Sequence, residues 1–347
     1  MPTRHGILSP MAPHPPQMPP FGTSFGETMA VAHWASDGWS SVSLEPVAPL
    51  RMHPAAHALH YGSSCFEGLK AHRGIDDTVR IFRLDRHVAR LRWSAERLHL
   101  PVPEAEVVAD MIVETVRSNL HLVPDPPGSL YIRPTLVGTA PNIGAAGSPT
   151  TEAILYILTS PVGDYFAGGV DPLRIAVETQ RPRTTPQFGS VKTGANYAMA
   201  LGVTMVARAR YGVAQVLFAP DGVIQETGAS NVLLISDQAV VTPVLDGSFL
   251  EGVTRDSLLT LAADRGMKVD ERVVTVDDLT AWCSSDEVAL SGTAAVLAPV
   301  GTLVIDGDEV AVGDGNAGRE TLELRQALID TQIGRLPDRY GWTLPVT

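Results

Sequence analysis

One lysine stands in surroundings that suit covalent chemistry. Lys192 lies in the run GSVKTGANY (residues 189–197), and no other charged side chain occurs between Thr184 and Ala207. A free lysine amine has a pKa of about 10.4, so its use as a nucleophile requires desolvation or an imine bond. The small residues around Lys192 leave room for a bulky aldehyde. An ordinary, partly buried lysine would fit this window as well, so Lys192 needs partners before it can be assigned to catalysis.

Pyridoxal phosphate is the cofactor that most often uses such a lysine. It requires a partner for its pyridine nitrogen, a donor to its phenolate oxygen and a phosphate cradle. Glu226, in a turn between two strand-like runs, is the candidate for the ring nitrogen. Tyr197 follows Lys192 closely enough to donate to the phenolate oxygen. Each has an ordinary alternative, which is a surface turn acid for Glu226 and core packing for Tyr197.

Two segments suit a phosphate group. The run EGVTRD (251–256) opens a helix whose unpaired N–H groups and dipole attract anions, and Thr254 adds a hydroxyl. The run SGTAA (291–295) is a turn of small residues after a strand, with the hydroxyl of Thr293. Arg90, beside an apolar helical stripe, could grip a phosphate with two hydrogen bonds. A threonine N-cap and a solvated arginine are the ordinary alternatives.

Composition limits the function classes. A net charge of −12 disfavours binding to nucleic acid or anionic lipid, and 347 residues suffice for two domains of ordinary size. Cys65 and Cys283 lie far apart without a C-x-x-C motif, which suits a reducing compartment and suggests no metal site. We therefore expect a cytoplasmic protein. Residues 1–20 are rich in proline and lack a signal-like apolar run, so we expect a flexible leader.

Apolar periodicity predicts an α+β first half and an α/β second half. Val88, Leu91, Ala95 and Leu98 form one helical stripe, with Asp85 as the expected N-cap. Further helices are expected around 108–116, 197–210, 254–265 and 319–333, and strands at 130–133, 154–158, 173–177, 216–219, 232–235 and 288–290. The predicted division is a leader (1–20), a small N-terminal domain (21–160), a Gly- and Pro-containing linker (161–172) and a large cofactor-binding domain (173–347).

These segments, in this order, resemble the fold-type-IV enzymes that use pyridoxal phosphate, and most closely the branched-chain amino acid aminotransferases. The resemblance covers nearly the whole chain after the leader. Its other motifs are FGT (21–23), ALHYG (58–62), FEGLK (66–70), LYIRP (130–134) and SPVG (160–163). It implies a two-domain homodimer that transfers an amino group between a branched-chain or related hydrophobic L-amino acid and 2-oxoglutarate.

The resemblance also implies residue roles. Lys192 would bond covalently to the cofactor and move the proton, Glu226 would pair with the ring nitrogen and Tyr197 with the phenolate oxygen. The phosphate would be held by Arg90, Val253, Thr254 and Thr293. The substrate carboxylate would lie near Thr293 and Ala294, and the pocket positions are Tyr61, Phe66, Tyr131, Arg133 and Tyr165, with Arg133 for the distal carboxylate of glutamate. Small residues at Ala145, Ala195, Ala229 and Ser230 depart from the family pattern and leave the preferred amino acid open.

Other functions remain open. Within the same fold, they are a lyase of the aminodeoxychorismate type, a D-amino acid aminotransferase or a non-catalytic binding protein. The run GDGNAG (313–318) matches the dinucleotide pattern of NAD-dependent dehydrogenases, but too few residues follow for a second strand. The run GTSFG (22–26) matches a hydrolase pattern but has no preceding strand. His53, His57 and His60 have helical metal-ligand spacing interrupted by Pro54, and we expect them in a loop.

Overall fold

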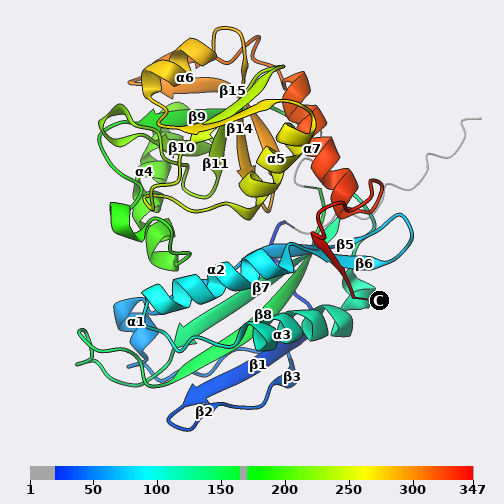
Figure 1. The fold of residues 1–347 in the computed structure, drawn as a ribbon. Helices are drawn as coiled ribbons and strands as arrows, with labels where there is room; N and C mark the ends of the chain where they lie inside the picture. The colour runs from blue at the N-terminus through cyan, green and yellow to red at the C-terminus, as the bar shows by residue number, and fades with distance from the viewer. Residues whose placement is uncertain (1–19, 165–169, 347) are drawn as a thin grey trace, which may run out of the picture.

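The structure is a computed structural model that describes residues 20–164 and 170–346. Its described residues form two β-sheets, one from each half of the chain, with helix α2 (Leu84–Arg97) lying between them (Figure 1). This confirms the predicted combination of an α+β half with an α/β half. The other helices are α1 (His57–Tyr61), α3 (Ala105–Ser118), α4 (Gly194–Tyr211), α5 (Val253–Asp264), α6 (Val276–Trp282) and α7 (Arg319–Gln332).

The first sheet is antiparallel throughout its described strands. Its order is β17-β6-β5-β7-β8-β1-β2, with β3 paired to β1 and β4 paired to β7. Long apolar strands at its centre pack against α2 and α3 and enclose the first core. The strands are β1 (Thr28–Ala35), β2 (Gly38–Trp39), β3 (Ser43–Pro46), β4 (Ser64–Phe66), β5 (Leu69–Arg73), β6 (Val79–Phe82), β7 (Ser129–Gly138), β8 (Ala153–Val162) and β17 (Thr343–Pro345).

The second sheet mixes parallel and antiparallel pairs. Its order is β10-β9-β15-β14-β11-β12-β13, with β16 paired to β15. Helix α4 covers one side of this sheet near β10, while α5 and α7 pack together on the other side (Figure 1). The strands are β9 (Leu173–Glu178), β10 (Gln215–Phe218), β11 (Asn231–Ile235), β12 (Ala239–Pro243), β13 (Lys268–Arg272), β14 (Glu287–Gly292), β15 (Val296–Ile305) and β16 (Asp308–Ala311).

The two amphipathic helices of the first half form where the apolar stripes predict them. The N-cap of α2 is Arg83, however, and not Asp85. Arg83 adopts a left-handed backbone conformation (φ 52°), and its guanidinium pairs with Asp256 at 2.7 Å on α5. The residue before this helix is thus tied to α5 by a long-range ion pair, and Asp85 lies in the first turn of α2, where its charge still favours the helix dipole.

The C-terminal strand crosses back to the first sheet. The predicted boundaries assign every residue from 173 onwards to the second domain, whereas Thr343–Pro345 pairs with β6. Strand β8 continues to Val162 and β9 begins at Leu173, so the expected linker contains little regular structure in its described part. Within residues 20–164 and 170–346, none of the helices has the length and apolar run needed to cross a membrane.

Two of the three histidines expected in a loop lie on a helix instead. His57 and His60 belong to α1, because Pro54 precedes this helix and does not interrupt it. The ring of His57 is buried and bonds to Ser63 Oγ at 2.8 Å and to the carbonyl oxygen of Ser148 at 3.1 Å. This ring therefore fastens the connection between β7 and β8.

Candidate active site

Lys192 lies just before α4, and the first domain holds its backbone. Its N–H donates to Ser94 Oγ on α2 at 3.0 Å, and its carbonyl accepts the N–H of Phe66 at 3.1 Å. The side-chain amine donates to Tyr197 Oη at 3.0 Å. Because α4 begins at Gly194, Tyr197 falls in its first turn and faces back toward the lysine. The structure thus brings together the two residues that the sequence paired.

The phenol of Tyr197 lies near an aromatic ring and two cations, and its pKa is lowered. Its ring lies 5.3 Å from that of Phe66, between centroids. Burial alone raises the pKa of Tyr197, but the Lys192 ammonium and the Arg183 guanidinium outweigh burial and lower the pKa below its usual value. A phenol in this state readily supports negative charge on a neighbouring oxygen through a strong hydrogen bond.

Glu226 is buried, with 2% of its surface exposed, and is held by three groups. Arg183 Nη1 lies 2.6 Å from its Oε1 as an ion pair, although the angle falls outside hydrogen-bond geometry. The N–H of Leu250 donates to the same oxygen at 3.1 Å, and the amide of Asn231 donates to Oε2 at 3.2 Å. Burial raises the pKa of Glu226, and Arg183 and the Leu250 N–H only partly offset this effect.

Arg183 is a residue that the sequence analysis missed. It is 2% exposed, donates to the carbonyl of Gly228 and lies with Cζ 5.5 Å from the centre of the Tyr197 ring. Arg183 therefore lies next to both Glu226 and Tyr197, the two predicted partners of Lys192. The only sequence signal is its position, since it is the last charge before the uncharged window around the lysine.

The first turn of α5 presents open N–H groups. Gly252, and not Thr254, is the N-cap residue, and no side chain caps this helix. A Cβ at Gly252 would lie 2.0 Å from Asn231 Oδ1, so only glycine fits this close approach. Val253 and Thr254, both predicted to hold phosphate, occupy the first two helical positions, where N–H groups lack intrahelical partners.

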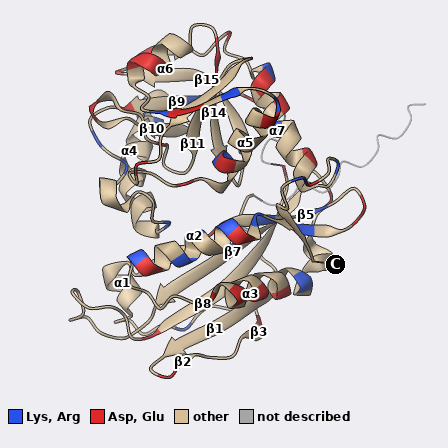
Figure 2. Cartoon of the chain, viewed as in Figure 1, with Lys and Arg blue, Asp and Glu red and all other residues tan. Residues whose placement is uncertain are grey.

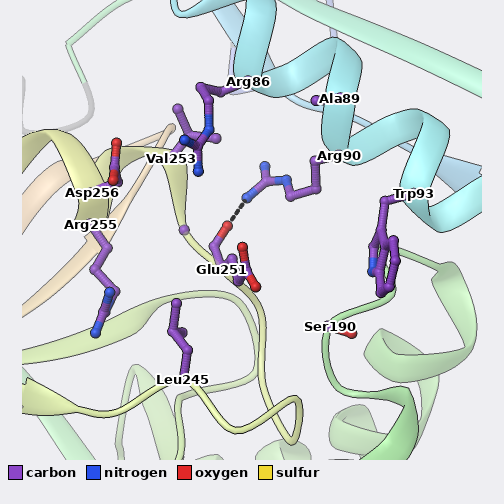
Figure 3. A pocket seen from close by; sticks show the side chains of 11 residues that line it. Arg86, Ala89, Arg90, Trp93, Ser190, Leu245, Glu251, Val253, Arg255 and Asp256 are labelled. Carbon is purple, nitrogen blue, oxygen red and sulfur yellow. Dashed lines mark hydrogen bonds between the residues drawn. The ribbon is translucent and has the colours of Figure 1, made fainter. Parts of the chain in front are cut away.

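Arg90 reaches from α2 toward this turn (Figure 3). Its Nε and Nη2 are bonded to the two oxygens of Glu67 at 2.6 and 3.0 Å, and its Nη1 donates to the carbonyl of Glu251 at 2.6 Å. The expected two-point grip is thus made on Glu67, which leaves Nη1 at the cradle. A cavity of about 450 Å³ opens between α2 and the start of α5, beside Arg90 and Gly252.

Glu67 is fully buried and orients this arginine. His87 Nδ1 lies 2.7 Å from Glu67 Oε2. Burial raises the pKa of Glu67, but Arg90 and His87 together outweigh burial and hold this pKa well below its usual range. The sequence analysis placed Glu67 in a motif without giving it a role.

The second small-residue turn is fastened to the first sheet. Thr293 Oγ1 donates to the carbonyl of Gly68 at 3.0 Å, and the carbonyl of Ala294 accepts from Lys70 Nζ at 2.9 Å. The hydroxyl of Ser291 is buried and has no hydrogen-bond partner in the part of the chain that the structure describes. The turn therefore has a fixed backbone and an unused hydroxyl beside it.

A second cavity, of about 330 Å³, contains three of the predicted pocket residues, Phe66, Tyr131 and Arg133. Arg133 Nη2 donates to Tyr131 Oη at 2.8 Å, and its Cζ lies 4.6 Å from the centre of the Phe66 ring. Among the described residues, the buried Nε of Arg133 has no hydrogen-bond partner. Lys192 Nζ lies 5.3 Å from the centre of the same Phe66 ring, so the lysine and the arginine both lie against this ring.

Of the two other predicted pocket residues, one lies away from this cavity and the other lies outside the described residues. Tyr61 lies on α1, and its hydroxyl donates to the carbonyl of Ile143 in the β7–β8 connection. It does not line the cavity around Phe66 as described. Tyr165 lies outside the described residues, so its predicted role is untested.

The residues present fit pyridoxal phosphate. The uncapped turn of α5, its close-packed Gly252 and Arg90 Nη1 provide an anion site that no described side chain fills. Lys192, Tyr197 and Glu226 supply the three groups that the aldehyde, phenolate and ring nitrogen need. These features lie along one interdomain region that includes α2 and the start of α4.

The competing motifs have structural explanations. At GDGNAG (313–318), the carboxylate of Glu287 accepts the N–H groups of Glu320 and Thr321 at 3.0 and 2.8 Å. A protein anion therefore occupies the start of α7, where a dinucleotide would place its pyrophosphate. The run GTSFG (22–26) leads directly into β1 and does not join a strand to a helix, as a hydrolase elbow requires.

Known proteins share this sequence and fold. The family model "Amino-transferase class IV" matches residues 64–303. The chain is 37% identical over 344 residues to branched-chain-amino-acid aminotransferase 2 of Bacillus subtilis, covering 96% of this chain and 93% of that protein. It is 38% identical over 338 residues to a probable branched-chain-amino-acid aminotransferase of Streptomyces coelicolor, covering 93% and 91% respectively.

Two solved branched-chain amino acid aminotransferases are also similar. The T.th. enzyme with pyridoxamine 5'-phosphate has a TM-score of 0.76 and 30% identity over 92% of this chain and 99% of that one. The Escherichia coli enzyme has a TM-score of 0.74 and 28% identity over 93% and 100%.

The chain therefore belongs to the class IV amino-transferases, the fold-type-IV group that uses pyridoxal phosphate. The predictions of family, fold class, enzyme type and cofactor are confirmed.

Proposed function

We propose that this aminotransferase moves an amino group between a branched-chain or related hydrophobic L-amino acid and 2-oxoglutarate. The observation that carries the proposal is the placement of Lys192 Nζ and the Arg133 guanidinium against the same Phe66 ring, at 5.3 and 4.6 Å. This arrangement sets a reactive amine beside a pocket that has aromatic walls and one cation. The names of the relatives from Bacillus subtilis and Streptomyces coelicolor support the same substrate class.

The proposed roles follow from the contacts. When bound, pyridoxal phosphate supplies an electron sink that acidifies the α-proton and a carbon that accepts the amino group. Lys192 Nζ holds and moves the α-proton. Tyr197 Oη donates to the phenolate oxygen, and Glu226 accepts the ring N–H, with Arg183 favouring its ionised form. The N–H groups of Val253 and Thr254 and Arg90 Nη1 bind the phosphate. We keep Thr293 in its phosphate and carboxylate roles through its backbone N–H, because its hydroxyl already donates to the carbonyl of Gly68.

One pocket has to accept two unlike side chains. Phe66, Tyr131 and Phe21 offer apolar surface to a branched side chain, because Phe21 packs edge-on against Tyr131 at 5.0 Å. Arg133 offers its free Nε and its charge to the distal carboxylate of glutamate. We propose that the guanidinium, stacked between two rings, tolerates an apolar neighbour because its flat face is weakly hydrated.

The covalent step is tested by Lys192→Ala. We expect this variant to lose the visible, borohydride-reducible chromophore and turnover, while Lys192→Arg, which keeps the charge, also loses both. A Lys192→Ala enzyme that retained chromophore and turnover would refute the assignment. The substrate class is tested by a panel of L- and D-amino donors with 2-oxoglutarate. Pyruvate release from a chorismate-derived amine without an acceptor would favour a lyase instead.

We further propose a homodimer that uses the exposed face of α4. This helix exposes Met199, Leu201, Met205 and Val206 by 52 to 65%, and Figure 2 shows α4 largely free of charged side chains. A contiguous apolar helix face of this kind favours a second copy of the chain. Met205→Glu should yield monomers in sedimentation velocity, whereas Arg210→Glu, at the charged end of α4, should not. A wild-type monomer would exclude this proposal.

We also retain a cytoplasmic location as a proposal. It rests on Cys65 and Cys283, which are both buried and unpaired. Fractionation of the native cells would test it.

A further inference from the structure

The turn 291–295 joins β14 to β15 and is also bonded to one strand of the first sheet. Lys70 on β5 extends its Nζ to the carbonyl oxygen of Ala294 at 2.9 Å, and Gly68, just before β5, accepts the hydroxyl of Thr293 at 3.0 Å. Lys70 is only 8% exposed. A buried ammonium is costly unless it compensates for its lost hydration, so its placement here calls for a role.

The surroundings of Lys70 are polar and tightly enclosed. His72 on β5, Asp164 after β8 and Arg325 on α7 face it around a cavity of about 30 Å³. Burial, aided by Arg325 and opposed by Asp164, lowers the pKa of Lys70 to about 8. Burial and the neighbouring Lys70 lower the pKa of His72 to about 3, so this imidazole is neutral near pH 7. Lys70 is therefore the group of this cluster that changes charge at mildly alkaline pH.

The carbonyl that Lys70 grips belongs to the peptide joining Ala294 to Ala295. An ammonium on the Ala294 carbonyl polarises this peptide and strengthens the N–H of Ala295 as a donor, because linked hydrogen bonds reinforce one another. It also adds positive charge next to the turn without lining the substrate cavity around Phe66. Both effects favour an anion at the turn, and both depend on the proton of Lys70.

We propose that Lys70 is a positioning residue whose ammonium holds the Thr293–Ala294 turn and increases its affinity for the substrate carboxylate. The inference rests on the proposed function, which brings the carboxylate to this turn. Lys70 acts through the Ala294 peptide and touches no reacting atom.

The test measures binding of 4-methylvalerate, a carboxylate with a leucine-like side chain and no amino group, to the holoenzyme by titration calorimetry. Lys70→Met should raise the Kd for 4-methylvalerate by about tenfold at pH 7, since a charged donor contributes more than a neutral one. Lys70→Arg keeps a cation that does not titrate and should restore affinity. Arg73→Met is the matched control, because Arg73 lies on the same strand but bonds to the carbonyls of Leu120 and Val123.

The pH profile separates a charge effect from a merely structural one. Wild-type affinity should fall as the pH rises from 7 to 9.5, because Lys70 loses its proton in this range, whereas Lys70→Arg should lose less. A Kd for Lys70→Met within twofold of wild type at pH 7, or a Lys70→Arg profile that follows wild type, would overturn the inference. If Lys70→Met does not fold, the Lys70→Arg profile still decides. Failure of wild type to bind 4-methylvalerate, or an active Lys192→Ala enzyme, would instead count against the proposed function.

Discussion

Removing Arg183 should expose how much of the site depends on one buried charge. In the cofactor-free protein, Arg183→Met would leave Glu226 with the N–H of Leu250 and the amide of Asn231 and no cation in contact. Both members of the pair are almost fully buried, with side chains 3% and 2% exposed. The variant should therefore lose far more stability than a surface ion pair contributes.

The size of the loss follows from the protonation of Glu226. A buried carboxylate that loses its cation can take up a proton, and at pH 7 this costs about 4 kcal/mol for a group with an ordinary pKa of about 4.3. Breaking a buried pair by removing one partner typically costs about 3–5 kcal/mol, which agrees. We therefore expect Arg183→Met to lower the free energy of unfolding by about 3–4 kcal/mol at pH 7.

The pH dependence gives the sign. The pKa of Glu226 is already raised in the folded protein, and loss of Arg183 raises it further. A raised folded pKa destabilises the native state increasingly as the pH rises above the unfolded value. The gap between wild type and Arg183→Met should therefore shrink by at most about 2 kcal/mol between pH 7 and pH 5.5, because wild-type Glu226 also takes up some protons in this range.

Urea unfolding of the cofactor-free proteins at the two pH values measures both quantities. Arg174→Met is the control, because Arg174 pairs with Glu309 at a similar 2.7 Å but on the surface, with side chains 32% and 64% exposed. It should cost much less, because solvent screens an exposed ion pair. A loss below about 1 kcal/mol for Arg183→Met, or a gap that does not change with pH, would refute the reasoning.

Three further predictions concern the cradle and its supports. Glu67 has a folded pKa below its usual range, so its stabilising effect is complete above about pH 4.3 and is lost on acidification; Glu67→Gln should therefore be less stable than wild type at pH 7 and should converge with it toward pH 3 in thermal unfolding. Gly252→Ala, whose Cβ would lie 2.0 Å from Asn231 Oδ1, should weaken pyridoxal phosphate binding by about tenfold or more in fluorescence titration, whereas Gly202→Ala, with nothing within 4 Å, should not; equal affinities would contradict the cradle assignment. Glu287→Gln should cost about 1–2 kcal/mol of stability at the start of α7 and leave cofactor affinity unchanged, and a loss of affinity would show that this helix end serves the site.

The parts of the fold that the sequence predicted are those that local patterns determine. The stripe of Val88, Leu91 and Ala95 produces an amphipathic helix whatever it packs against, and α2 appears where the stripe lies. Lys192 and Tyr197 are close in the chain, so the start of α4 suffices to bring them together. The helix expected at 254–265 appears as α5, although its N-cap is Gly252 and not Thr254.

The parts that escaped prediction depend on contacts between distant segments. Arg183 meets Glu226 only because β9 and β10 pair in parallel and bring the segments that follow them together. The N-cap of α2 is Arg83 and not Asp85, and Arg83 contacts Asp256 and Trp342, which both lie far along the chain. No periodicity in the sequence records such a pairing. Strand β17 escaped for the same reason, since its partner β6 lies in the other half of the chain.

The residues that the sequence analysis missed hold other residues in place and are not themselves expected to contact the cofactor. The groups that pyridoxal phosphate requires are matched in the sequence by Lys192, Tyr197 and Glu226. These matches do not show what holds those groups, and here the holding contacts cross between the sheets: Ser94 fixes the Lys192 backbone, and Lys70 fixes the Ala294 carbonyl. Two segments of the second half, the Lys192 backbone and the Ala294 turn, are therefore held by hydrogen bonds from the first half. A side chain whose role is to hold another domain's loop resembles an ordinary buried cation in the sequence, and only the fold distinguishes the two.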